Sequence, residues 1–249
     1  MTKTNASDFS SFEVLLLRSN NELGTSVLLI LAWLAASDGS IDQSEANKLA
    51  QISEASKHGH DIQPILRLAK ERDLDALQLA AEIVQKHFRG EKGKLFMEMA
   101  VGMAIEDGYL LPSENYILRF LADLLGLSSA ELNAAFTEVT DRDMPDPSDP
   151  SEADYWKARE ENSQRQSRSG SGSSHHHASA PRSEKAIRAF ATLGLEYGAS
   201  TDEVKRAYRH LAQVHHPDRF SPLGDESVAV ATSTFQRIKA AYDYLMANA

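Results

Sequence analysis

The residues best placed to do chemistry in this sequence form a short loop near its C-terminus, His216-Pro217-Asp218. A residue before proline is pushed out of the helical region, so a helix that ends by His215 gives way here to extended backbone. Pro217 also fixes its own φ, which stiffens the loop. We therefore expect Asp218 to be held at a rigid tip, where its carboxylate can accept a bidentate hydrogen bond from an arginine of a partner protein.

Two amphipathic segments flank this loop and predict an antiparallel helical pair. The first runs from about Thr201 to His215 and opens with Ser200 and Glu203 at capping-box spacing. The second runs from about Ser227 to Ala247. Apolar residues recur in both segments at intervals of three and four, as in the seam between two packed helices. These residues are Val204, Ala207, Tyr208, Leu211, Phe235, Ile238, Tyr242 and Leu245.

The first of these helices carries a basic face. Lys205 and Arg209 stand four residues apart, so they share one side of the helix, with Arg206 beside them. Such a face would steer an acidic patch of a partner toward the loop. The alternative is a solvated helix face with no partner, and the adjacent loop favours the partner-binding role. His210 stands next to the basic residues and would make their combined charge depend on pH.

Residues 189–245 resemble a J-domain of the DnaJ co-chaperone family throughout their length. Leu193-Gly194 resembles the turn after the family's first short helix, and the basic helix resembles its second. His216-Pro217-Asp218-Arg219 matches the family's hallmark loop, and the helix around Tyr242 resembles its third.

The resemblance implies a function. A J-domain binds a DnaK-type heat-shock chaperone and stimulates ATP hydrolysis by that partner, so this chain would be a co-chaperone that needs no cofactor and is not itself an enzyme. The resemblance places the partner-binding surface on the loop and on the helix before it. The implied residues are Lys205, Arg206, Tyr208, Arg209, His216, Pro217 and Asp218.

Composition excludes several other classes of protein. The net charge of −10 argues against nucleic acid or an anionic membrane surface as the main partner. Cysteine is absent, which removes disulfides, thiolate zinc sites and cysteine nucleophiles. The most apolar run, residues 27–36, is half as long as the roughly twenty residues that a bilayer requires. We therefore expect no membrane span and a cytoplasmic location.

The N-terminal half predicts a helical bundle with an internal repeat. Helical periodicity persists over residues 8–140 without sustained strand alternation. Residues 35–45 align with residues 104–114 at an offset of 69, and each copy predicts a helix, an Asp-Gly turn and a new helix. Pro112 fits the first position of the second new helix. The pattern resembles the TerB-like family of tellurite-resistance proteins. With a J-domain behind it, the chain resembles DjlA-type co-chaperones, but without their membrane anchor.

The Asp-Gly turns also raise the possibility of a metal site. Asp38, Asp42 and Glu45 fit the second half of a calcium-binding EF-hand loop, but Leu34 and Ala36 replace the acidic ligands of its first half. Turn formation and helix capping explain the same residues. The alternative function is a metal- or stress-ligand-binding bundle whose J-domain is only a docking adaptor. Its candidate ligands are Asp38, Asp42, Glu45, Asp107 and Glu114.

These features predict an all-α protein with two domains and a tether. We expect a TerB-like bundle over residues 8–140 and a J-domain over residues 183–249. Residues 141–182 combine alternating prolines with a Ser/Gly run and three consecutive histidines, which is typical of a disordered linker. The bundle would recruit a client protein or set the protein's location, and the sequence does not identify that client.

Overall fold

The computed structural model describes most of the chain, in segments separated by gaps. The described residues are 10–19, 21–38, 49–50, 52, 62–105, 108–149, 151–152, 156–157 and 184–248. Regular structure in these segments is helical, which confirms the all-α prediction. The three consecutive histidines and the Ser/Gly run of the predicted linker lie outside the described residues.

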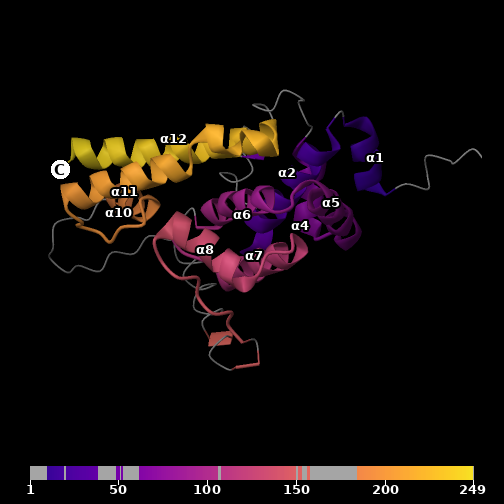
Figure 1. Ribbon diagram of the computed structural model, residues 1–249, viewed down its shortest axis with the longest axis horizontal. Helices are drawn as coiled ribbons and strands as arrows, with labels where there is room; N and C mark the ends of the chain where they lie inside the picture. The colour runs from indigo at the N-terminus through magenta and orange to yellow at the C-terminus, as the bar shows by residue number, and fades with distance from the viewer. Residues whose placement is uncertain are drawn as a thin grey trace, which may run out of the picture.

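The N-terminal bundle is built around one apolar helix, α2 (Glu22–Ala35). Residues 27–32 of this helix are all buried, because a helix that is apolar on every side must be covered on every side. The surrounding helices are α1 (Ser11–Arg18), α4 (Ile62–Glu71), α5 (Leu74–His87), α6 (Glu91–Ala104), α7 (Pro112–Leu124) and α8 (Ser129–Thr140), and the 3-10 turn η2 (Ala36–Asp38) extends α2. Contacts with α4, α5 and α6 place α2 at the centre (Figure 1).

The predicted internal repeat is visible in the helix bounds. Helices α2 and α6 are both 14 residues long, and α6 begins and ends 69 residues after α2. The helices that pack against them are also equivalent, because α2 packs against α4 and α6 packs against α8. Pro112 occupies the first position of α7, as predicted, and Glu114 accepts a hydrogen bond from the backbone N–H of Leu111 at 2.8 Å.

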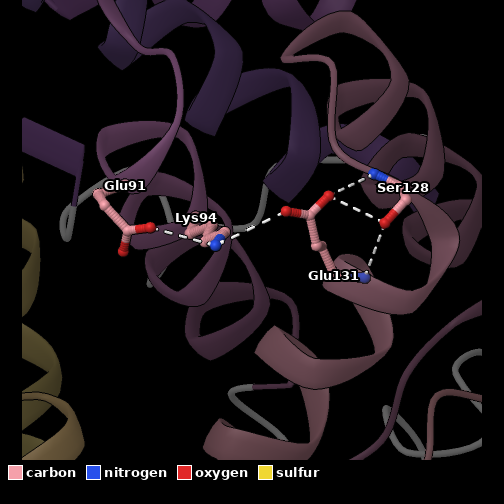
Figure 2. Close-up of polar contacts among 4 residues, drawn as sticks. All are labelled: Glu91, Lys94, Ser128 and Glu131. Carbon is pink, nitrogen blue, oxygen red and sulfur yellow. Dashed lines mark hydrogen bonds and ion pairs between the residues drawn. The ribbon is translucent and has the colours of Figure 1, made fainter.

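Polar contacts tie α6 to α8 at one end of the bundle. Lys94 lies between two carboxylates, 3.1 Å from Glu91 and 3.6 Å from Glu131 (Figure 2). The Glu131 side chain also caps α8, because it accepts hydrogen bonds from the N–H and hydroxyl of Ser128, each at 2.9 Å. Exposed pairs of this kind add little stability, so the packing of α6 against α8 accounts for most of the contact between the two helices.

The C-terminal domain consists of three α-helices and a 3-10 helix. They are α10 (Glu184–Thr192), α11 (Thr201–Val214), η3 (Pro217–Leu223) and α12 (Asp225–Ala247). Helix α11 starts with the predicted capping box, in which Glu203 accepts from the backbone N–H of Ser200 at 2.7 Å. Helix α12 starts two residues earlier than predicted, because Asp225 and Glu226 supply the acidic first turn that helix N-termini favour.

The predicted seam forms the core of the C-terminal domain. Helices α11 and α12 pack along each other, and α10 packs against α12. Tyr208 and Tyr242 stack across the seam with ring centroids 4.1 Å apart. The core is small, and its buried residues are Ala189, Leu193, Val204, Leu211, Ile238, Ala241 and Leu245.

Helix α12 belongs to both halves of the molecule. Its C-terminal half pairs with α10 and α11, and its N-terminal half reaches α6 and α2 of the N-terminal bundle (Figure 1). The apolar residues around the start of α12 are therefore buried in the bundle's core rather than in the seam. They are Val214, Phe220, Leu223, Ala229, Val230 and Ala231. The two domains thus share a continuous apolar contact.

Candidate partner-binding site

The HPD loop (residues 216–218) has the stiff backbone that its sequence predicts. His216 is extended, with φ −65° and ψ 127°, and Pro217 begins η3. The N–H of Asp218 donates to Nδ1 of His216 at 3.3 Å, and the N–H of Arg219 donates to the carbonyl of His216 at 3.0 Å. Because Nδ1 accepts, the neutral ring carries its proton on Nε2.

The loop presents its carboxylate to solvent. The Asp218 side chain is 91% exposed, and Oδ2 lies 3.7 Å from Nδ1 of His216. The His216 ring is half exposed and meets Phe235 of α12 edge-on, with centroids 5.9 Å apart. An exposed carboxylate on a fixed backbone can accept from a guanidinium without first being ordered.

The basic face of α11 is exposed as predicted, but its residues do not all point the same way. Lys205 and Arg209 lie together, and Nε of Arg209 donates to the carbonyl of Lys205 at 3.2 Å. Arg206 instead lines a cavity of about 540 Å³ between the two domains. Tyr208 is half-buried and stacked on Tyr242, so the structure gives it a packing role, and its part in partner binding stays a prediction.

His210 turns away from the basic face and joins α11 to the bundle. Its Nε2 lies 2.8 Å from the carbonyl oxygen of Glu138 on α8. Nearby, Nη2 of Arg142 donates to the carbonyl of Gly194 at 2.9 Å. These bonds join the domains along the edge of the interdomain cavity.

Arg219, the residue after the HPD loop, is held by the bundle. Its Nη2 lies 2.8 Å from Oε2 of Glu98 on α6, and its Nη1 donates to the carbonyl of Val214. Burial raises the pKa of Glu98, and the guanidinium opposes that rise. The basic residue that follows the HPD loop, Arg219, is therefore paired with a residue of the bundle and does not face outward.

His215, the residue before the HPD loop, is buried against α6. Its ring is packed onto Gly102, where an added Cβ would overlap Cε1 of the ring. Burial, together with the positive charges of Arg237, Arg219 and His210, lowers the pKa of His215 to about 4. The neutral ring is therefore the form that this contact holds near neutral pH.

A third contact fixes the start of α12 on α2. The carboxylate of Glu226 is buried and accepts from Nδ2 of Asn21, at 2.9 Å and 3.0 Å from its two oxygens. The Asn21 side chain also caps α2 by accepting from the N–H of Gly24 at 2.9 Å. A Cβ at Gly24 would overlap the Glu226 carboxyl group, so this carboxyl group can lie so close to α2 only because residue 24 is glycine.

Sequence reasoning missed these contacts between the domains. A signal was present, because Gly24 and Gly102 lie inside helices, where glycine costs about 1 kcal/mol relative to alanine. Such a glycine usually marks a close approach by another group. Nothing in the sequence states which group approaches, so His215 and Glu226 could not be identified as the partners.

The predicted metal ligands are not brought together by the part of the chain that is described. Asp42, Glu45 and Asp107 and the side chain of Asp38 lie outside the described residues, and Glu114 caps α7. Within the described segments no group of three or more His, Cys, Asp or Glu side chains could hold a metal ion.

Two regions of the chain match known protein families. Residues 188–249 match the DnaJ domain, and residues 24–137 match the tellurite resistance protein TerB. A TerB-like region followed by a DnaJ domain is the arrangement of a J-domain protein with an N-terminal TerB-like domain, and this chain has that arrangement.

Over most of its length the chain also resembles proteins named co-chaperone protein DjlA. It is 28% identical to the one from Vibrio vulnificus over 233 residues, which is 90% of this chain and 77% of the relative. It is 27% identical to the one from Shewanella oneidensis over 246 residues, covering 94% and 82% of the two chains. No solved structure matches the chain significantly. Among the described residues, no helix has the length and apolar character to cross a membrane.

Proposed function

We propose that this chain is a co-chaperone that binds a DnaK-type heat-shock chaperone through the HPD loop and the exposed face of α11, and that it stimulates the partner's ATP hydrolysis. The observation that carries the proposal is the geometry of Asp218, whose carboxylate is 91% exposed on a backbone held by its neighbours. The DnaJ domain match over residues 188–249 and the similarity to DjlA co-chaperones support the same function.

In this proposal the chain acts as an allosteric ligand and not as an enzyme. The chemistry takes place at the nucleotide site of the partner, and this chain binds one conformation of the partner more tightly than the other. Asp218 pairs with an arginine of the partner, and His216 and Pro217 fix the shape of the loop. Lys205 and Arg209 steer an acidic surface of the partner onto α11.

The proposal divides the chain into a bundle over residues 8–140, a tether over 141–182 and a J-domain over 183–249. The bundle recruits a client protein or sets the protein's location. Because the partner consumes ATP, the proposal places the protein in the cytoplasm. The bundle's role rests on the architecture alone, and recovery of no protein above background with the full chain carrying Asp218→Asn as bait would count against it.

Single-turnover ATP hydrolysis by DnaK tests the proposal. Wild type should accelerate hydrolysis in a saturable manner, and His216→Gln and Asp218→Asn should abolish the acceleration. Asp202→Asn is the matched control, because Asp202 is also an exposed aspartate but lies in the first turn of α11. Acceleration that survives Asp218→Asn would contradict the proposal. Binding without acceleration would reduce the chain to an adaptor.

A second measurement tests the basic face. Lys205→Ala with Arg209→Ala should raise the concentration needed for half-maximal stimulation and weaken its dependence on salt. The reason is that the two charges act on the approach of the partner and are screened by ions. An unchanged half-maximal concentration at low salt would mean that this face is merely solvated.

A further inference from the structure

The N-terminal bundle holds both flanks of the HPD loop. On one side His215 is packed on Gly102, and on the other Arg219 is paired with Glu98. Both bundle residues lie on α6, four residues apart, so they share one face of that helix. The three loop residues between these anchors remain half-buried or exposed.

The Gly102 contact demands the absence of a side chain. A Cβ at this position would overlap Cε1 of His215 and lie 3.3 Å from both ring nitrogens. Optimal separations between carbon atoms are about 3.5–4.0 Å, so the ring would have to move. The ring is buried, and its backbone is the C-cap of α11 directly before His216. If the His215 ring moved, the backbone of the HPD loop would therefore have to shift with it.

The Glu98 contact is a partly buried, charge-assisted hydrogen bond. The side chains of Glu98 and Arg219 are 15% and 34% exposed, and 2.8 Å separates their bonded atoms. Arg219 also donates to Val214 at the end of α11. The guanidinium thereby connects α6 to both ends of the loop.

The HPD loop is supported from both domains, because Phe235 of α12 meets the His216 ring edge-on and the bundle holds the apolar residues that follow the loop. Phe220 and Leu223, which follow the loop on η3, are buried in the core of the N-terminal bundle. The start of α12 is fixed on α2 through Glu226 and Asn21. Without the bundle, η3 would lose the core that its apolar residues occupy.

We propose that α6 is part of the chaperone-binding device, with Glu98 and Gly102 as positioning residues that fix the HPD loop without touching the partner. This inference rests on the proposed function. Fixing the backbone of one residue corresponds to a factor of about ten in an equilibrium constant. Loss of either anchor should therefore weaken the affinity for DnaK about tenfold or more, because the partner must then order the loop itself.

The test compares two glycine substitutions in the same helix of the full chain. Gly102→Ala should displace His215, whereas a Cβ at Gly93 would make only ordinary contacts, the nearest at 3.5 Å from the carbonyl oxygen of Phe88. Both substitutions replace glycine by alanine within α6. We expect Gly102→Ala to raise the half-saturating concentration for stimulation about tenfold, with the rate at saturation retained, and Gly93→Ala to leave both unchanged.

A second pair removes the charge without adding bulk. Glu98→Gln should raise the half-saturating concentration, and Glu91→Gln should not, because the Glu91 side chain is 90% exposed and Lys94 keeps Glu131 as a partner (Figure 2). This pair keeps the inference testable if Gly102→Ala fails to fold. His215→Ala in the Gly102→Ala chain makes room for the new methyl group, so it should restore part of the affinity.

Amide hydrogen exchange at His216, Asp218 and Arg219 supplies a readout that needs no partner. Exchange should be faster in Gly102→Ala and Glu98→Gln than in their controls. If the variants equal their controls in exchange and in half-saturation, while Asp218→Asn still abolishes stimulation, the positioning role is refuted and the proposed function stands. If wild type gives no stimulation, the proposed function fails and α6 has no role in partner binding.

Discussion

Acid should loosen the contact between the two domains at His215. The side chain is 4% exposed and lies against Gly102 of α6. The titratable or charged groups that face it are Arg237 of α12, Arg219 of η3 and His210 of α11. Protonation of this buried ring would create a positive charge that is shielded from water and lies close to other positive charges.

The sign and size of the effect follow from the pKa of His215. Its ordinary value is 6.5, and burial together with the nearby positive charges lowers it to about 4 in the folded chain. Between these values the unfolded state binds the proton more readily, so stability is full above pH 6.5 and is lost as the pH falls toward 4. The difference corresponds to about 3 kcal/mol of unfolding free energy at most.

The pKa of Glu98 is shifted in the opposite sense to that of His215. Burial raises the pKa of this carboxyl, so the folded state takes up its proton more readily than the unfolded state does. The pH dependence of wild type alone would therefore mix the two effects. Glu98 and the other titratable groups are present in both wild type and His215→Gln. Their contributions therefore cancel in the difference between the unfolding free energies of the two chains.

Urea unfolding of wild type and His215→Gln at neutral pH, at pH 6.5 and near pH 4 measures this difference. The stability of wild type relative to the variant should fall by up to about 3 kcal/mol from neutral pH to pH 4. A relative stability that does not change with pH would refute the burial of His215 between the domains.

Three further experiments test the packing. Phe220→Ala should lower the unfolding free energy by about 3–5 kcal/mol, because the ring is fully buried in the core of the N-terminal bundle, and a loss as small as that of the half-exposed Phe120→Ala would contradict this placement. Asn21→Ala should cost about 1–3 kcal/mol in thermal or urea unfolding, because the buried Glu226 carboxylate loses a donor, and no loss would show that the anchor on α2 is absent. A double-mutant cycle of Tyr208→Leu and Tyr242→Leu should give a coupling energy of about 0.5–1.5 kcal/mol, and additive effects would rule out the stacked geometry.

Patterns among residues close together in the sequence were enough to predict several of the helices. The three- and four-residue periodicity predicted α11 and α12 within two residues at each end, and the 69-residue offset predicted the equivalence of α2 and α6. Proline chemistry predicted the end of α11 before the HPD loop and the start of α7 at Pro112. Each of these features depends on residues close together in the chain.

The docking of the two domains was not predictable in the same way. Periodicity shows that Phe220 and Val230 are apolar and need burial, but not which core receives them. The partners Glu98 and Arg219 are 121 residues apart, and each has an ordinary sequence context. His210 was expected to modulate the basic face of α11, and the structure joins it to Glu138 instead.

The most direct test of the central claim is amide hydrogen exchange of the full chain with and without DnaK and ATP. If the HPD loop binds the partner, exchange at His216, Asp218 and Arg219 should slow when DnaK is added, and Asp218→Asn should remove the effect. Protection confined to the N-terminal bundle, with unchanged exchange at the loop, would contradict the claim and place the partner-binding surface elsewhere.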